Sequence, residues 1–162
     1  MLNSMGMGGI ENFIMNLYRS IDREQYQFDF ILQSKEEGYF EKEIEELGGN
    51  IYKIPRIEKQ PLKHIKELKK ILKSNEYIAF HRHTANSIVF VDLAIAQFCN
   101  IKTVIVHSHS TSHPNEKLNK MFRPLLYSLA DEHLACGQAA GEWLYGDKEF
   151  KIINNRNATR KI

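Results

Sequence analysis

The chain lacks a strong charge imbalance, a long apolar run and a signal sequence. Its 162 residues carry 22 basic and 20 acidic side chains, which gives a formal net charge of +2. Dedicated nucleic-acid binders usually show a clear basic excess, so we expect no nucleic-acid partner. No apolar stretch approaches the ~20 residues that span a bilayer. The glycine-rich start also lacks the basic-then-apolar order of a signal peptide, and we expect a cytoplasmic protein.

Cysteine is scarce, and neither repeats nor low-complexity linkers divide the chain. Cys99 and Cys136 lie far apart and form no CxxC pair, so we expect two reduced, buried thiols. The hydrophobic content of 43% and the length suffice for one domain with its own core. The prediction is a single domain over residues 1–162.

Short apolar segments alternate with segments of helical periodicity. This alternation predicts an α/β fold with a doubly wound, Rossmann-like parallel sheet, covered by helices on both faces. Pro124 should kink its helix, because its ring clashes with the carbonyl of Lys120. Ligands of such sheets bind at the carboxyl ends of the strands. We expect strands at residues 28–32, 51–54, 77–80, 103–106, 133–136 and 150–153, and helices at 10–21, 39–47, 61–72, 86–99, 118–129 and 138–145.

A glycine pair, Gly8 and Gly9, opens the first helix. Glycines there let the backbone approach a ligand, and the free N–H groups of the first turn attract anions. The alternative is a plain tight turn. Glu11 would repel a phosphate, so we assign it a structural role in which its carboxylate folds back onto the backbone at Gly8.

Two His-x-His pairs follow two predicted strands. In extended backbone, alternate residues share a face, so His81 pairs with His83 and His107 with His109. Four imidazoles could bind a metal, but no carboxylate or cysteine lies beside them, and Arg82 is a poor neighbour for a divalent cation. We therefore expect no metal. The open alternatives are hydrogen bonds to loop carbonyls, or to polyhydroxyl or phosphate groups with one histidine near the chemistry.

Other polar residues have both a functional and an ordinary interpretation. The hydroxyls that follow His107 could line a pocket or simply form turns. We predict that Arg82, His83, Ser108 and Ser110 bind substrate. A row of lysines could be a solvated helix face, or a peripheral contact with an anionic membrane surface worth ~1 kcal/mol per basic residue. These lysines are Lys59, Lys63, Lys66, Lys70 and Lys73.

In their order and spacing, these motifs resemble the amino-terminal part of retaining glycosyltransferases of the GT-B architecture. The family is group 1, or family four, of capsular polysaccharide and exopolysaccharide biosynthesis. Its members usually carry a small residue where Arg82 stands. The segments that carry the resemblance are residues 4–19, 48–55, 81–83, 107–111, 135–137, 141–146 and 152–155.

The resemblance implies one lobe of a two-lobed enzyme. This lobe would bind a glycan or lipid-linked acceptor, and a carboxyl-terminal lobe would hold the nucleotide-sugar, which is a substrate; no cofactor is implied. Gly8 and Gly9 would face the donor phosphates. His107 and His109 would be the catalytic positions near the transferred sugar.

Two departures from the family pattern shape the remaining expectations. Only residues 1–4 precede the glycine turn, which predicts a truncated first strand and a homodimer that covers exposed sheet edges. At residues 156–158, Arg-Asn-Ala stands where the family usually has Asn-Gly, and no donor-binding domain follows. The chain alone should then be inactive. The alternatives are a non-catalytic glycan- or nucleotide-binding module, a split enzyme with a separate donor-domain partner, and a metal-dependent hydrolase using the four histidines.

Overall fold

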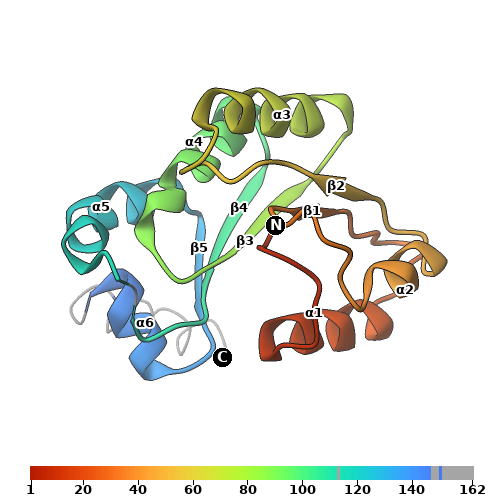
Figure 1. The fold of residues 1–162 in the computed structure, drawn as a ribbon, viewed down its shortest axis with the longest axis horizontal. Helices are drawn as coiled ribbons and strands as arrows, with labels where there is room; N and C mark the ends of the chain where they lie inside the picture. Colours follow the sequence, from red (N-terminus) through yellow and green to blue (C-terminus); the bar gives the residue numbers. More distant parts are fainter. Residues whose placement is uncertain (113, 147–149, 151–162) are drawn as a thin grey trace. The chain divides into compact units, whose positions relative to one another are not determined.

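The computed structural model describes residues 1–112, 114–146 and 150, and it confirms an α/β protein with parallel sheets (Figure 1). The chain forms two compact units, Met1–Ile71 and Leu72–Ile162. The long helix α3 (Pro61–Ser74) contributes residues to both units. The prediction of a single domain over residues 1–162 stays a prediction.

The first unit contains a two-stranded parallel sheet. Strands β1 and β2 pair in register from Phe30 with Ile51 to Leu32 with Lys53. Leu2 adds an isolated parallel bridge to Leu32, and its N–H donates to the carbonyl of Ile31. The residues that precede α1 thus pair with β1 at one position. A truncated first strand stays a prediction. The elements are α1 (Gly9–Ser20), β1 (Phe30–Leu32), α2 (Glu41–Glu46) and β2 (Ile51–Lys53).

The core of this unit lies between α1, α2 and the sheet. Ile14, Met15 and Tyr18 are buried on one face of α1, as the helical spacing of apolar residues predicts. They pack in one cluster with Phe30 and Leu32 of β1. The Tyr18 hydroxyl donates to the carbonyl of Leu47 at 3.2 Å, which satisfies the polar end of a fully buried ring.

The second unit contains a three-stranded parallel sheet in the order β3-β4-β5, with β4 between its neighbours in Figure 1. The buried hydroxyl of Tyr145 donates towards the carbonyls of Val106 at 2.9 Å and Leu134 at 2.7 Å, which ties α6 to two strands. The elements are β3 (Ala79–Thr84), η1 (Ser87–Val89), α4 (Phe90–Phe98), β4 (Thr103–Ser108), α5 (Glu116–Leu129), β5 (Glu132–Ala135) and α6 (Gln138–Tyr145).

Several boundaries differ from the sequence-based predictions. Strand β3 runs to Thr84 and β4 to Ser108, so three of the four histidines lie within strands rather than after them. Pairing between the strands continues through these polar residues because backbone hydrogen bonds do not depend on side-chain polarity. The predicted helix at 86–99 starts as a 3₁₀ turn capped by Asn86. Helix α5 continues through Pro124. The predicted strand at 150–153 and residues 156–158 lie outside the described residues, apart from Phe150.

The prediction of two buried thiols was wrong. Cys136 is exposed and Cys99 is half-buried, because β5 and the end of α4 lie at the surface of the unit. On α3, Leu62 is 83% exposed, so it does not belong to the buried side of the helix. The residues buried on this helix are His64, Leu68, Ile71 and Leu72. Across the described residues, none of the helices is long and apolar enough to cross a bilayer.

Candidate functional site

The pairing of β3 with β4 brings four imidazoles together at the carboxyl ends of the two strands. The strands are parallel, and His83 is the register partner of His107. The N–H of His109 donates to the carbonyl of Thr84 at 3.1 Å, so His109 extends the pairing beyond β4. The predictions that each His-x-His pair shares a face and that the two pairs are neighbours are both confirmed.

The rings of this histidine cluster (His81, His83, His107 and His109) lie in contact. The ring centroids are 4.1 Å apart for His81 and His83 and 4.0 Å apart for His107 and His109. Between the strands, the centroids of His83 and His107 are 5.3 Å apart, and those of His81 and His107 are 5.5 Å apart. The four rings therefore form one contiguous cluster, carried by β3, by β4 and by the residue just after β4.

One hydrogen bond joins the two strands within the cluster. Nδ1 of His83 lies 2.9 Å from Nε2 of His109. In a pair of neutral imidazoles one of these nitrogens must carry the proton and the other must accept it. The bond thus couples the tautomers of the two rings, and it leaves Nε2 of His83 and Nδ1 of His109 as the nitrogens that can contact other groups.

The pKa of every ring in the cluster is lowered. Burial lowers the pKa of His81 to about 3, and burial with the proximity of His109 lowers the pKa of His107 to about 4. Burial, followed by the influence of His81, lowers the pKa of His83, and burial also lowers that of His109. The lowered pKa values favour the neutral form of each ring, which offers one donor and one acceptor.

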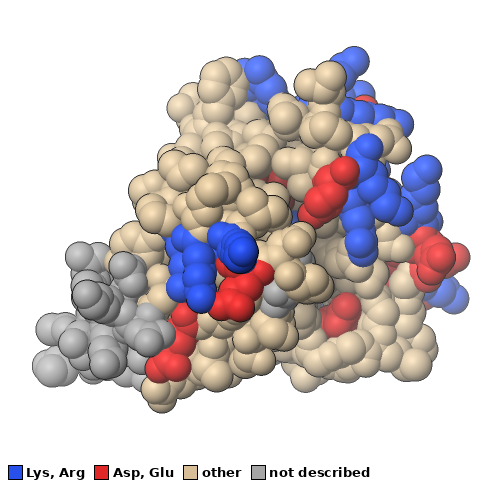
Figure 2. Space-filling view, turned by 60° about the vertical axis from the view of Figure 1, so that its left-hand side comes forward, with Lys and Arg blue, Asp and Glu red and all other residues tan. Residues whose placement is uncertain are grey.

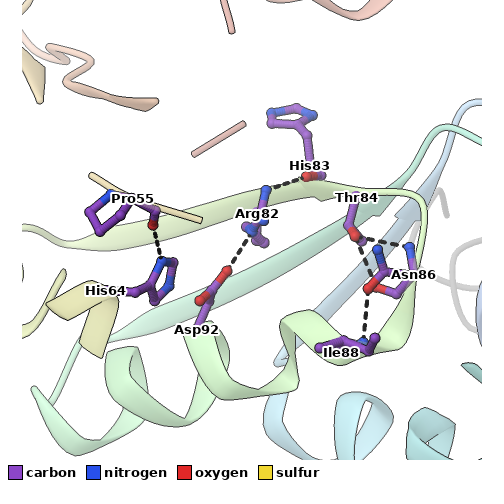
Figure 3. A network of polar contacts seen from close by, with 8 residues as sticks. All are labelled: Pro55, His64, Arg82, His83, Thr84, Asn86, Ile88 and Asp92. Carbon is purple, nitrogen blue, oxygen red and sulfur yellow. Dashed lines mark hydrogen bonds and ion pairs between the residues drawn. The ribbon is translucent and has the colours of Figure 1, made fainter. Parts of the chain in front are cut away.

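Arg82 lies on the opposite side of β3 from the ring of His83 (Figure 3). Its Nε atom donates to Oδ2 of Asp92 at 2.7 Å, and the two side chains are 7% and 1% exposed. A second guanidinium nitrogen donates to the carbonyl of His83 at 2.7 Å. Arg82 thus braces the backbone of the strand that carries His83. This geometry favours a structural role, and substrate binding by Arg82 stays a prediction.

The two predicted serines take different positions. Ser108 is fully buried, and its hydroxyl donates to the carbonyl of Ala140 at 2.6 Å, which fixes α6 to the end of β4. Ser110 is half-buried and donates to the carbonyl of Ser112 at 2.9 Å, in an ordinary turn contact. For both residues, contact with substrate stays a prediction.

The glycine pair belongs to the first unit. Gly8 is the N-cap of α1, and Asn12 donates from its side-chain amide to the Gly8 carbonyl at 2.9 Å. A Cβ on Gly8 would collide with the carboxylate of Glu11, whereas a Cβ on Gly9 would meet nothing within 4 Å. The Glu11 carboxylate therefore lies over Gly8, as expected. That the glycines face donor phosphates stays a prediction.

Residues outside the predicted set hold the loop that follows β3. Oδ1 of Asn119 accepts from the N–H of Ser87 at 2.6 Å, and Nε1 of Trp143 donates to the carbonyl of Ala85 at 2.8 Å. Asn119 is 1% exposed. In the sequence, Asn119 could have been noticed because it is a polar residue on the same helical face as Phe122 and Leu126. A polar side chain among apolar ones is typically buried and hydrogen-bonded.

Metal-ligand geometry occurs within the histidine cluster. One ring nitrogen from each of His81, His83 and His107 lies within 4.8 Å of the other two. No metal ion was expected from the sequence, because no carboxylate or cysteine lies beside the histidines and because Arg82 stands between two of them. In the structure the guanidinium of Arg82 lies on the opposite side of β3 from the ring of His83 and is paired with Asp92. The expectation of no metal stays a prediction.

The predicted row of lysines, four on α3 and Lys59 just before it, is at the surface. Lys59, Lys63, Lys66, Lys70 and Lys73 are all exposed. On the face seen in Figure 2, acidic side chains lie beside some of the basic ones. The exposure fits both a solvated helix and a peripheral membrane contact.

Comparison of the sequence with known proteins identifies a family. Residues 7–152 match the model of Glycosyltransferase Family 4. The chain is 32% identical over 158 residues to the protein named "Putative glycosyltransferase EpsF" from Bacillus subtilis (strain 168), across 93% of this chain and 41% of that protein. The chain thus spans about two fifths of the length of this curated relative. No solved structure matches the present chain. The matched region contains both strands of the histidine cluster, and the chain belongs to glycosyltransferase family 4.

Proposed function

We propose that this chain is the acceptor-binding lobe of a retaining GT-B glycosyltransferase. The enzyme would transfer a sugar from a nucleotide-sugar to a polysaccharide or lipid-linked acceptor in exopolysaccharide or capsule synthesis. The observation that carries the proposal is the histidine cluster, which lies at the carboxyl ends of two parallel strands inside the region that matches family 4. In α/β folds this edge of the sheet is where ligands bind.

The protonation state of the cluster suits sugar binding. A neutral imidazole both donates and accepts a hydrogen bond, as does a sugar hydroxyl. The lowered pKa values of His81 and His107 keep these rings neutral near pH 7. We assign His107 and His109 to the transferred sugar, where they orient hydroxyl groups or the reacting oxygen. We assign His83 to positioning, because its bond to His109 sets the tautomer of that ring.

The second part of the proposal concerns the rest of the enzyme. The EpsF protein is more than twice as long as the region that this chain matches, and a second lobe would bind the nucleotide-sugar. An active site assembled from two lobes depends on holding both substrates in one geometry. The lobe alone should therefore turn over no substrate. The exposed lysines of α3 would add peripheral attachment to an anionic membrane surface, where a lipid-linked acceptor resides.

A chimera tests the proposal. This chain would replace the matched region of EpsF, and transfer from radiolabelled UDP-, GDP- and ADP-sugars to a membrane lipid extract would be measured. We expect no transfer by the 162-residue chain alone and transfer by the chimera. In the chimera, His107→Gln and His109→Gln should each lower kcat at least about tenfold, because they remove contacts with the reacting sugar.

His133→Gln is the matched control. His133 lies on β5 with Val106 as its register partner, and side chains alternate between the faces of a sheet, so it faces away from His107. This variant should retain the kcat of the chimera. Robust turnover by the chain alone would overturn the two-lobe proposal. Equal activity of the His107 and His133 variants would overturn the assignment of the site.

A further inference from the structure

We propose that Arg82 is a positioning residue for the histidine cluster and that it acts from the side of β3 opposite to the ring of His83. It holds the peptide group of His83 and, through the bond between His83 and His109, sets the tautomer that His109 presents to the sugar. The inference rests on the proposed function, in which His109 contacts the transferred sugar. Arg82 then acts on the substrate through His83 and not by direct contact.

The backbone carbonyl of His83 faces away from β4. Along a parallel strand, the carbonyls of successive residues point to alternate sides. The carbonyl of Thr84 accepts from the N–H of His109 at 3.1 Å on the β4 side, so the carbonyl of His83 points to the other edge of β3. Among the strands described for this sheet, in the order β3-β4-β5, none lies on that side. The sheet itself therefore fixes this peptide group from one side only.

The guanidinium of Arg82 supplies the hydrogen bond at this edge. Its Nη1 atom donates to the carbonyl of His83 at 2.7 Å, while its Nε atom donates to Oδ2 of Asp92 at 2.7 Å. The side chains of Arg82 and Asp92 are 7% and 1% exposed, so little water competes for either bond. Hydrogen bonds from a charged donor are about twice as strong as neutral ones. Arg82 thus holds the carbonyl of His83 as a neighbouring strand would.

Asp92 anchors the guanidinium to a helix. It lies in the first turn of α4, where a carboxylate also interacts favourably with the helix dipole. Its charge compensates that of Arg82, and a buried guanidinium without such a partner would be strongly destabilising. Because the guanidinium is a rigid planar fork, the pair connects the start of α4 to the end of β3 with little rotational freedom.

The hydrogen bond between the two rings depends on the orientation of His83. Nδ1 of His83 lies 2.9 Å from Nε2 of His109, and such a bond weakens steeply when the angle at the hydrogen falls below ~120°. A rotation of the backbone at His83 moves the ring, since the direction of Cβ follows the backbone. Groups at a functional site need to be held to about 10–20°. Loss of the bond from Arg82 should therefore release the tautomers of both rings.

NMR of the ring nitrogens in the 162-residue chain tests the inference without any sugar. In ¹⁵N-histidine-labelled protein at pH 8, the shift difference between the two nitrogens of a ring reports which nitrogen carries the proton. We expect a large difference for His83 and for His109 in the unaltered chain, which marks a single tautomer for each. Arg82→Lys keeps the charge beside Asp92 but not the fork. It should reduce both differences towards the small value of two exchanging tautomers.

A second variant separates positioning from stability. Arg82→Met with Asp92→Leu replaces the whole buried pair by apolar side chains and should stay folded. It also lacks the donor to His83, so it should show the same averaging of tautomers. Leu126→Ala is the control, because it removes a fully buried side chain of α5. This control should lower the urea midpoint and leave the nitrogen shifts of both rings unchanged.

Unchanged nitrogen shifts of His83 and His109 in a folded Arg82 variant would overturn the inference. Averaged tautomers in the unaltered chain, or an equal change in the Leu126 variant, would do so as well. In the EpsF chimera, Arg82→Lys should lower kcat with little change in KM, because the sugar contacts remain while the reacting group is less well oriented; an unchanged kcat in an active chimera would contradict this. An inactive chimera would count against the proposed function alone, since the spectra do not depend on sugar transfer.

Discussion

Loss of charge at Asp92 should be among the most damaging single changes in the second unit. Its Oδ2 accepts from Nε of Arg82 at 2.7 Å, and the two side chains are 1% and 7% exposed. Asp92→Asn leaves the guanidinium buried beside a neutral amide. Breaking one side of a buried ion pair costs about 3–5 kcal/mol, a large part of the 5–15 kcal/mol that typical domains possess.

The measurement is urea unfolding followed by circular dichroism. With a slope of about 2 kcal/mol per molar urea, the midpoint should fall by about 1.5–2.5 M. The double variant Arg82→Met with Asp92→Leu should recover most of this loss, because apolar residues that replace a whole buried pair are often neutral or stabilising. Glu116→Gln, which removes an exposed partner of Lys120 on α5, should leave the midpoint nearly unchanged. A loss under 1 kcal/mol for Asp92→Asn, or a double variant as unstable as the single one, would refute the reasoning.

Three further predictions concern pH, packing and hydrogen bonding. The pKa of His107 is lowered to about 4, whereas a histidine in the unfolded chain titrates near 6.5, so the unfolded state binds the proton first as the pH falls. Between pH 6 and 4 the free energy of unfolding should therefore fall by about 1.4 kcal/mol per pH unit for this group. A His107→Gln variant whose free energy of unfolding falls with the same slope as that of the unaltered chain would contradict the assignment. Gly38→Ala should destabilise the first unit, because the added Cβ would lie 2.6 Å from the carbonyl oxygen of Met5. The Cβ of Gly9→Ala would meet nothing within 4 Å, so this variant should stabilise α1 by up to about 1 kcal/mol. Equal melting temperatures for the two variants would argue against this packing. Ser108→Ala removes the buried hydrogen bond to the carbonyl of Ala140 and should cost about 1–3 kcal/mol in urea unfolding, and an unchanged midpoint would mean that the bond is absent.

The arrangement of the elements could be predicted because local patterns agree with one another. Helical spacing of apolar residues located α1, and the run from Gln138 to Tyr145 formed a helix with the predicted bounds. The alternation of side chains along a strand was enough to predict that His81 and His83 share a face. These features depend on periods of 3.6 and 2 residues, which are visible without any knowledge of the tertiary fold.

What could not be predicted depends on contacts between distant residues. The partner of Arg82 is Asp92 on the following helix, and no local pattern distinguishes this buried pair from a solvated one. The anchoring of Ser87 by Asn119 spans 32 residues. Leu62 fits the apolar spacing of α3 but is exposed, because burial depends on what packs against a helix face. The pairing of Arg82 with Asp92 could not be predicted for the same reason.

The most direct measurement is a ligand titration followed through the imidazole signals of the histidine cluster by NMR. The 162-residue chain would be titrated with UDP-glucose, UDP-N-acetylglucosamine and a panel of short oligosaccharides at millimolar concentrations. The account predicts that ring signals of His83, His107 and His109 shift with a saturable dependence on at least one of these compounds. The signal of His133, on the other face of the sheet, should stay in place. Shifts confined to His133, or none in the cluster with every compound, would contradict the proposal that these imidazoles bind the sugar.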